Sequence, residues 1–149
     1  MSVPWFADGL RFACTRCGNC CRGAGSVRVS DAEIVRLSRR LALDDLEFRA
    51  MYTRRLRGGD VSLRETREKA CVFYDPAVGC RVHSDRPLQC RSWPFWSAVV
   101  HSPERWAEEA QNCPGMNRGP RRDAGHIART AERDGTSMGR TAQGSLRRR

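Results

Sequence analysis

Four cysteines stand close together near the start of the chain, in the stretch Cys14-Thr-Arg-Cys17-Gly-Asn-Cys20-Cys21. Thiolates two residues apart can turn toward one point, because a tight turn between them aims the backbone amides and both sulfur atoms inward. Many zinc and iron–sulfur sites begin with this spacing. The stretch therefore predicts a metal centre.

Four more cysteines follow, and the candidate ligands and cofactor-binding residues are all eight: Cys14, Cys17, Cys20, Cys21, Cys71, Cys80, Cys90 and Cys113. Neighbouring side chains in an extended stretch point to opposite sides, so Cys20 and Cys21 fit two centres better than one tetrahedral ion. Alternatively, one is a ligand and the other packs nearby. Two four-sulfur sites or one leaner cluster both remain open. The N-terminal four and Cys90 are the strongest candidates, and Cys113 is the weakest by position.

Eight cysteines in a short chain could instead form four disulfides. The first residues show no basic stretch followed by an apolar run, and no segment is long and apolar enough to cross a membrane. We therefore expect a cytoplasmic location, where thiols stay reduced and metal is favoured. The apolar fraction is 40% and the charged fraction 30%, so metal crosslinks would add stability that a thin core lacks.

The net charge of +10 is unevenly distributed. Residues 117–149 hold nine arginines against three acidic residues, so they contribute +6 of it. All but one of the 27 basic residues are arginine, which indicates a coding bias rather than a phosphate-binding face. We expect no membrane partner, and nucleic-acid binding only through the C-terminal tail, if at all.

Helical patterns occupy the first half of the chain. A capping box, Ser30-Asp31-Ala32-Glu33, predicts a helix over about 31–41. A second helix should begin near residue 44, carry Phe48, Tyr52 and Leu56 on one stripe, and end before Gly58-Gly59. Two strand-like runs, 71–74 and 80–83, are joined by a turn-forming stretch that Asp75 caps, and they predict a β-hairpin.

After the hairpin, Arg86-Pro87 can open a short helix that carries Cys90. We expect Trp93, Phe95 and Trp96 to cover the cysteines. Further helices are expected from about residue 103 to 110 and, more weakly, over 124–133. The fold class is α+β: a small irregular domain of short helices and one β-hairpin organised around a cysteine metal cluster. Residues 1–119 should form this domain, and 120–149 an Arg-rich, mostly disordered tail.

The string Phe12-x-Cys14-x-x-Cys17-Gly-Asn-Cys20-Cys21 resembles the C-x-x-C-x-x-C-C signature of the YkgJ family of cysteine-cluster proteins, which are zinc- or iron-chelating domains. The second half agrees through Cys71-Val-Phe, Gly79-Cys80, the stretch from Arg86 to Trp96, and Cys113-Pro-Gly. The resemblance covers about residues 5–119. His83 stands where the family usually carries an aromatic residue, so Cys80-x-x-His83 is not interpreted as a zinc half-site.

The resemblance implies a metal-binding protein that acts in metal handling, electron transfer or as an accessory factor. A relative, the flagellin lysine N-methylase, shares the cysteine motif, so the alternative is an iron–sulfur enzyme of oxidoreductase or protein methyl-transfer type. The ferredoxin-like spacing, the aromatic residues and the lack of a well-placed histidine favour an iron–sulfur cluster, with a [4Fe–4S] form included. Zinc remains the alternative. No catalytic residue is identified, and no protein partner is indicated.

Overall fold

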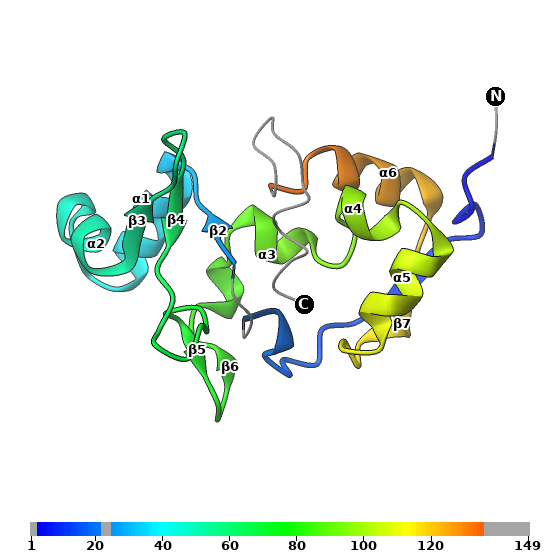
Figure 1. Ribbon diagram of the computed structural model, residues 1–149, viewed down its shortest axis with the longest axis horizontal. Coiled ribbons are helices and arrows are strands. Elements are labelled where there is room, and N and C mark those ends of the chain that lie inside the picture. The colour runs from blue at the N-terminus through cyan, green and yellow to red at the C-terminus, as the bar shows by residue number, and fades with distance from the viewer. Residues whose placement is uncertain (1–2, 22–24, 136–149) are drawn as a thin grey trace.

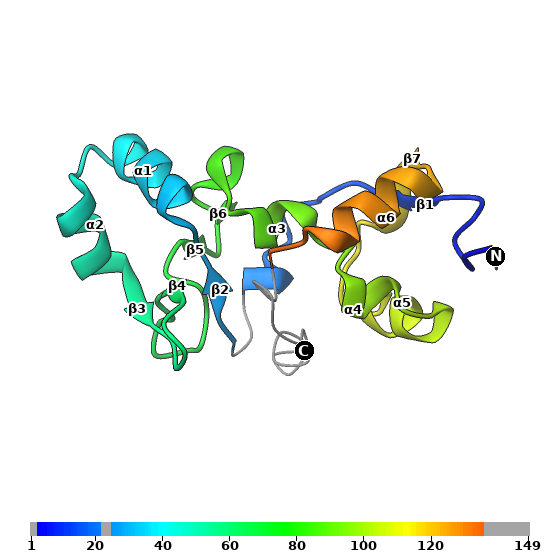
Figure 2. The same ribbon diagram turned by 90° about the horizontal axis from the view of Figure 1, so that it is seen from above.

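Two hydrophobic cores organise the chain. Figures 1 and 2 show the arrangement of the helices and strands from two directions. The computed structural model describes residues 3–21 and 25–135. Residues 25–82 form what we call the sheet lobe, on the left of Figure 1. Residues 3–13 and 93–135 form the helical lobe, on the right. Between the lobes lie residues 83–92, with a 3₁₀ turn, η2 (His83–Asp85), and helix α3 (Leu88–Ser92).

Helix α1 (Asp31–Arg40) begins where the sequence predicts it. The Ser30 hydroxyl accepts the backbone N–H of Glu33 at 3.2 Å, and a Glu33 carboxylate oxygen accepts the N–H of Ser30 at 2.9 Å. This reciprocal pair satisfies two donors that the first helical turn would otherwise leave open. The stripe formed by Ile34 and Leu37 is fully buried in the core of the sheet lobe.

Helix α2 (Asp45–Tyr52) also has a capping box, but it is shorter than predicted. At Thr53 the chain enters strand β3 (Thr53–Arg55), which pairs with β4 (Val61–Leu63); β4 in turn pairs with β2 (Val27–Arg28). The prediction that Leu56 continues the helical stripe is therefore wrong. Pairing of β3 with β4 brings Leu63 into the core, where it is 2% exposed, and this outweighs continuation of the helix.

The predicted hairpin forms, but only its inner part is regular. Strand β5 (Tyr74–Asp75) pairs with β6 (Gly79–Cys80), and the Asp75 carboxylate accepts the N–H of Ala77 at 2.7 Å, as expected for a residue that caps the turn. Cys71 lies before the paired segment, and His83 lies in η2. Gly79 has a positive φ of +83°, and a Cβ there would lie 2.8 Å from the carbonyl oxygen of Arg16. Glycine thus lets the N-terminal cysteine loop approach the hairpin.

The helical lobe contains α4 (Ser97–Val100), α5 (Pro103–Ala110) and α6 (Ala124–Glu132), with β1 (Leu10–Phe12) paired to β7 (Met116–Arg122). Its core is aromatic, because Phe95 stacks on Trp106 with ring centroids 5.9 Å apart. Trp96 is 1% exposed, and its ring N–H donates to the Gln89 carbonyl at 2.8 Å. The sequence predicted α5 and α6 but not the pairing of β1 with β7.

Residues 120–135, which composition assigned to a loose tail, are packed against this lobe. Ile127 of α6 is fully buried, and the Asp134 carboxylate accepts the N–H of Ser97 at 2.9 Å. The boundary predicted at residue 119 falls inside β7. The composition of this segment does not reveal the packing, because only a few apolar residues among many arginines form the contacts. The rest of the predicted tail, 136–149, lies outside the described residues.

The architecture is the α+β arrangement that the sequence predicts, with short helices and sheets of two or three strands. Within residues 3–21 and 25–135, no helix combines the length and the apolar character needed to cross a lipid bilayer.

Candidate metal centre

Every cysteine whose side chain is described lines one cavity between the two cores. These residues are Cys14, Cys17, Cys21, Cys71, Cys80, Cys90 and Cys113. The eighth candidate, Cys20, belongs to a 3₁₀ turn, η1 (Asn19–Cys21), but its side chain lies outside the described part of the chain. The cavity volume is about 60 Å³, and the walls between the thiols are largely apolar. Three segments far apart in sequence thus bring their sulfur atoms to one place.

The N-terminal cysteines are presented by a loop whose N–H groups face the sulfur atoms. The Cys14 sulfur accepts the N–H of Arg16, and the Cys17 sulfur accepts the N–H of Asn19, each at 3.4 Å. Gly18 has a φ of +80°, and a Cβ there would lie 2.3 Å from the ring of Tyr74. N–H groups directed at sulfur stabilise the negative charge of a thiolate, so this loop suits metal binding.

The sheet lobe holds the next cysteines at fixed distances from this loop. The N–H of Cys71 donates to the carbonyl of Cys21 at 2.6 Å, which ties the two segments together. Cys80 lies on β6 opposite Tyr74, and Cys90 lies on α3. Cys21, Cys80 and Cys90 all pack against the core of the sheet lobe. The hydrophobic core therefore positions these thiols before any metal is considered.

Cys113 is the contribution of the helical lobe. Its sulfur accepts the ring N–H of Trp93 at 3.4 Å. Burial raises the pKa of the Cys113 thiol, and the nearby Cys17 adds to the rise, while N–H groups from Trp93, Gly115 and Met116 act in the opposite direction. Cys113, the weakest candidate by its position in the sequence, thus lines the cavity and lies near Cys17. A metal that binds it must displace a proton.

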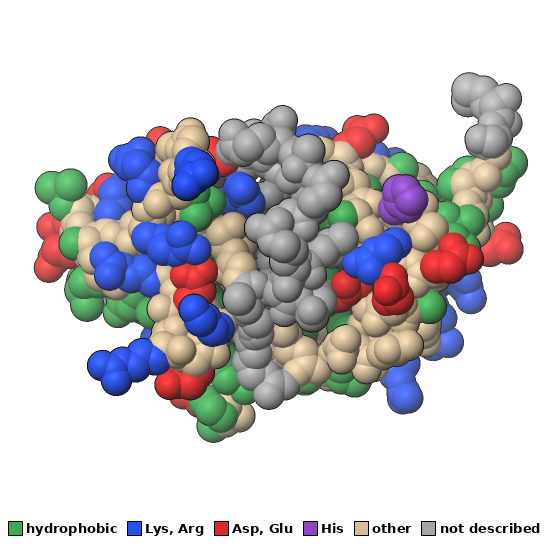
Figure 3. All heavy atoms as spheres, in the orientation of Figure 1, with side chains coloured by type: hydrophobic (Ala, Val, Ile, Leu, Met, Phe, Trp, Pro, Cys, Tyr) green, Lys and Arg blue, Asp and Glu red, His purple; other side chains and the backbone are tan. Residues whose placement is uncertain are grey.

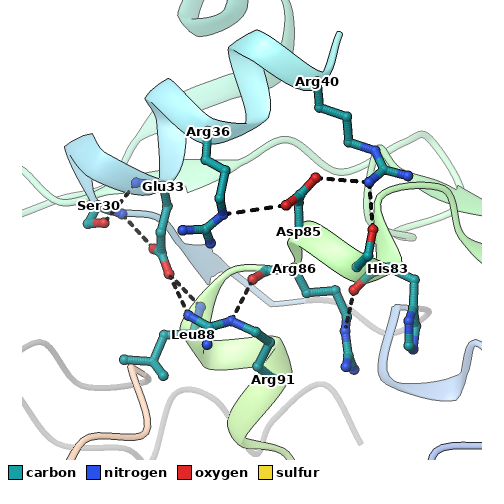
Figure 4. Close-up of polar contacts among 10 residues, drawn as sticks. Ser30, Glu33, Arg36, Arg40, His83, Asp85, Arg86, Leu88 and Arg91 are labelled. Atoms are coloured by element: carbon teal, nitrogen blue, oxygen red, sulfur yellow. Dashed lines mark hydrogen bonds and ion pairs between the residues drawn. The ribbon is translucent and has the colours of Figure 1, made fainter.

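The helix that carries Cys90 is anchored to α1 by Glu33, as Figure 4 shows. One carboxylate oxygen of Glu33 completes the capping box of α1, and the other accepts the N–H of Leu88, at the start of α3, at 2.5 Å. The guanidinium of Arg91 lies 3.9 Å from the same oxygen. Sequence reasoning identified only the capping role of Glu33. The second role depends on a contact 55 residues away, which no local pattern reveals.

The turn before α3 is held by a second ionic contact to α1. Asp85 accepts from Arg40 at 2.9 Å and lies 3.7 Å from Arg36 (Figure 4). Arg86 donates to the carbonyl of His83 at 2.8 Å. Arg86 and Arg91 flank Cys90 on either side in the sequence. Among the described contacts, Asp85 pairs with arginines of α1.

His83 forms part of the cavity wall. Its Nδ1 lies 3.3 Å from the guanidinium of Arg16, and burial, followed by the charges of Arg86 and Arg16, lowers the pKa of His83. Arginine has no acceptor, so Nδ1 must accept and the proton of the neutral ring must sit on Nε2. Nε2 is buried without a hydrogen-bond partner among the described residues. The ring therefore offers an N–H group in a cavity rich in sulfur.

The predicted aromatic cover is correct only for Trp93. Trp93 lines the cavity, whereas Phe95 and Trp96 do not line it and belong to the core of the helical lobe. The reason is the turn after α3, beyond which the chain continues into α4 and carries the later aromatic residues away from the cysteines. His101 and His126 are exposed.

The residues present fit a sulfur-ligated metal centre. Thiols are soft donors, N–H groups point at Cys14, Cys17 and Cys113, and His83 supplies a further buried donor. At the same time, no three described His, Cys, Asp or Glu side chains stand close enough together to hold one ion. The described cysteines thus line one cavity without three of them meeting at a single ion site.

Comparison with known proteins agrees with this donor set. Residues 13–114 match the model of the CxxCxxCC family, which carries the description "putative zinc- or iron-chelating domain". No solved structure matches the chain.

Proposed function

Because the chain belongs to the CxxCxxCC family of zinc- or iron-chelating domains, we propose that its cysteine cavity holds an iron–sulfur cluster. One observation carries the proposal: thiols from residues 14–21, 71–90 and 113 line a single, largely apolar cavity. One cavity supports one shared centre rather than two separate four-sulfur sites. Four cysteines suffice for a [2Fe–2S] or [4Fe–4S] cluster, so the set includes more thiols than one cluster needs.

The number of cysteines around one cavity favours a cluster over a single zinc ion. Zinc binds sulfur at about 2.3 Å, which places the four sulfur atoms of a tetrahedral site about 3.8 Å apart. The described donors do not come together in such a group. A cluster spreads its thiolate ligands over a wider space, because bridging sulfides separate the iron atoms. The donor arrangement therefore suits a polynuclear centre.

The surroundings of the cavity suit an iron–sulfur cluster. Its inner wall excludes water, and its outer edge is open to solvent and to a reaction partner. Leu63, Phe73 and Val82 line the inner wall and are each at most 2% exposed. Cys14 and Cys17 are exposed at the outer edge. Electrons or metal can pass most easily at this edge, which supports a role in electron transfer, metal handling or as an accessory factor.

The test is purification without oxygen, followed by measurement of iron, acid-labile sulfide and zinc per chain. We expect iron and sulfide in equal amounts, together with the broad visible absorption of sulfide-to-iron charge transfer. Stoichiometric zinc without sulfide would contradict the iron–sulfur cluster but would still agree with a metal site in the cavity. The Cys17→Ser variant should lose the absorption, because a hydroxyl is a poor ligand for a soft centre.

A second candidate function is an enzyme that uses the centre, and one observation favours it. A groove on the surface shares Phe12, Cys14, Arg86 and Trp93 with the wall of the cysteine cavity. A substrate bound there would lie beside the metal. Protein lysine methylation fits this groove poorly, because its charged lining is arginine and would repel a lysine ammonium group.

A further inference from the structure

A groove of about 640 Å³ lies between α3, the end of β7 and α6. Pockets for small molecules usually have volumes of roughly 300–1,000 Å³, so the groove has the size of a ligand site. Its charged lining consists of five arginines from these separate parts of the chain: Arg86, Arg91, Arg122, Arg129 and Arg133. Its floor includes Phe12, Trp93 and Phe95.

The lining carries one sign of charge. No aspartate or glutamate is among its described residues, although the chain contains 17 of them. On the face drawn in Figure 3, by contrast, basic and acidic side chains are interspersed. Like charges gathered around a concave surface repel one another, and the concave shape strengthens their field. A bound anion would offset this repulsion.

Most of these arginines have no acidic partner within the described residues. Arg122, Arg129 and Arg133 take part in no ion pair there, and Arg86 donates to a backbone carbonyl. Arg91 lies 3.9 Å from Glu33, which is a loose contact. Guanidinium groups bind phosphate and carboxylate through paired N–H donors, so these side chains retain donors for a ligand.

The backbone fixes where the arginines stand. Arg129 lies in the last turn of α6, and Arg133 follows the helix directly as its C-cap residue. The helix is held by Ile127 in the core and by its cap at Asp123, whose carboxylate accepts the N–H of His126 at 2.8 Å. The arrangement is therefore built into the fold rather than left to mobile side chains alone.

The groove also leads to the metal centre. Cys14 is exposed and lines both the groove and the cysteine cavity, and so do Arg86 and Trp93. A ligand held by the arginines of α6 and β7 would thus extend toward Cys14. The position of this ligand beside a metal rests on the proposed function, whereas its binding to the arginines does not.

We propose that this groove binds a small polyanion with two or more phosphate or carboxylate groups, with one end beside Cys14. Such a ligand would be the substrate or the metal-carrying chelate that the centre acts on. Phosphate and carboxylate use the same guanidinium donors, so the experiment must separate the two sources.

The experiment is calorimetric titration of the protein as purified without oxygen, with pyrophosphate in one series and citrate in another. We expect at least one of them to bind, and the double variant Arg122→Gln/Arg129→Gln to bind about tenfold or more weakly. The control is Arg39→Gln/Arg57→Gln, which removes the same charge from exposed positions outside the groove and should change affinity less than about twofold. The stronger of the two ligands identifies the anion class.

Three outcomes would overturn the proposal: no binding of either anion, equal weakening in the two double variants, or stronger binding of single-stranded oligonucleotides as their length increases beyond the groove. The last would indicate a nucleic-acid surface instead. Metal content measured in the same samples separates this proposal from the previous one. Full metal without anion binding contradicts the groove alone, and anion binding without metal contradicts the cluster alone.

Discussion

The two lobes stabilise themselves in different ways. The core of the helical lobe contains the large aromatic rings of Trp93, Phe95, Trp96 and Trp106, and Cys113 is the one cysteine among the described side chains that packs against it. The strands of the sheet lobe are only two or three residues long. Its core includes Cys71, and Cys21, Cys80 and Cys90 pack against this core. Packing can stabilise the helical lobe, whereas the sheet lobe holds several thiols that a bound metal would crosslink. Dependence on metal should therefore be uneven across the molecule.

Removal of the metal should have the largest effect. Metal bound by thiolates can contribute roughly 10 kcal/mol or more to folding. After treatment with a strong chelator, we expect amide hydrogen exchange to accelerate much more in residues 61–90 than in 97–132. Mass spectrometry of peptides from the two ranges would measure this difference. Equal acceleration in both ranges would show that the lobes depend on metal to the same extent.

Replacing one cysteine from each lobe should reveal the same contrast. Cys71→Ser removes a buried thiol whose backbone is bonded to Cys21, so we expect loss of most bound metal and of several kcal/mol of stability. Cys113→Ser removes the single thiol of the helical lobe and should retain most of the metal. Metal analysis and thermal melting of both variants provide the measurement. Equal metal loss would place Cys113 among the essential ligands.

A pair of buried isoleucines tests packing in each lobe. Ile34 of α1 and Ile127 of α6 are both fully buried, and replacing either with alanine should cost about 2–5 kcal/mol. Ile34→Ala should also weaken metal retention, because α1 is bonded through Glu33 to the helix that carries Cys90. Ile127→Ala should leave metal retention unchanged. Chelator competition and chemical denaturation would measure the two effects separately.

Glu33→Gln should have a smaller effect than these core substitutions. The glutamine amide has one acceptor oxygen, so it can keep only one of the two hydrogen bonds that the Glu33 carboxylate accepts. We expect a loss of about 1–3 kcal/mol and faster release of metal. Glu47→Gln is the matched control, since Glu47 has the same place in the capping box of α2 and accepts the N–H of Asp44 at 3.2 Å. If both variants release metal at the same rate, the bond from Leu88 to Glu33 does not position Cys90.

The smallest effect is expected for His83→Ala. The imidazole lies in the cavity wall without a described partner at Nε2, so its removal breaks few contacts. Metal content should stay at the level of the unmodified protein, measured by elemental analysis. A metal-depleted variant would show that the imidazole is a ligand.

Much of the fold followed from local patterns. The capping boxes at Ser30 and Asp44 and the Arg86-Pro87 sequence predicted α1, α2 and α3, because a helix start depends on side chains only a few residues apart. The spacing of the cysteines predicted that many of them serve one kind of site. The structure brings seven of them to one cavity, and Cys20 remains a prediction.

What local patterns could not provide was the partner of each segment. The end of α2 at Tyr52 depends on β4, which lies several residues later in the chain. The burial of Ile127 depends on a core that it shares with Phe95, Trp96 and Trp106, so an Arg-rich composition concealed it. The arginine groove was missed for the same reason, because β7 and α6 meet α3 only in the folded chain.

The distribution of the cysteines along the chain also determines the order in which the ligands become available during synthesis. A ribosome that adds about 5–20 residues per second makes Cys71 roughly 3–11 s after Cys14. During that interval Cys14, Cys17, Cys20 and Cys21 are together without their partners, and a zinc ion can bind such a group. Zinc added during expression should therefore displace iron more effectively than the same zinc added to the purified protein. Equal displacement would mean that the finished cavity, and not the order of synthesis, selects the metal.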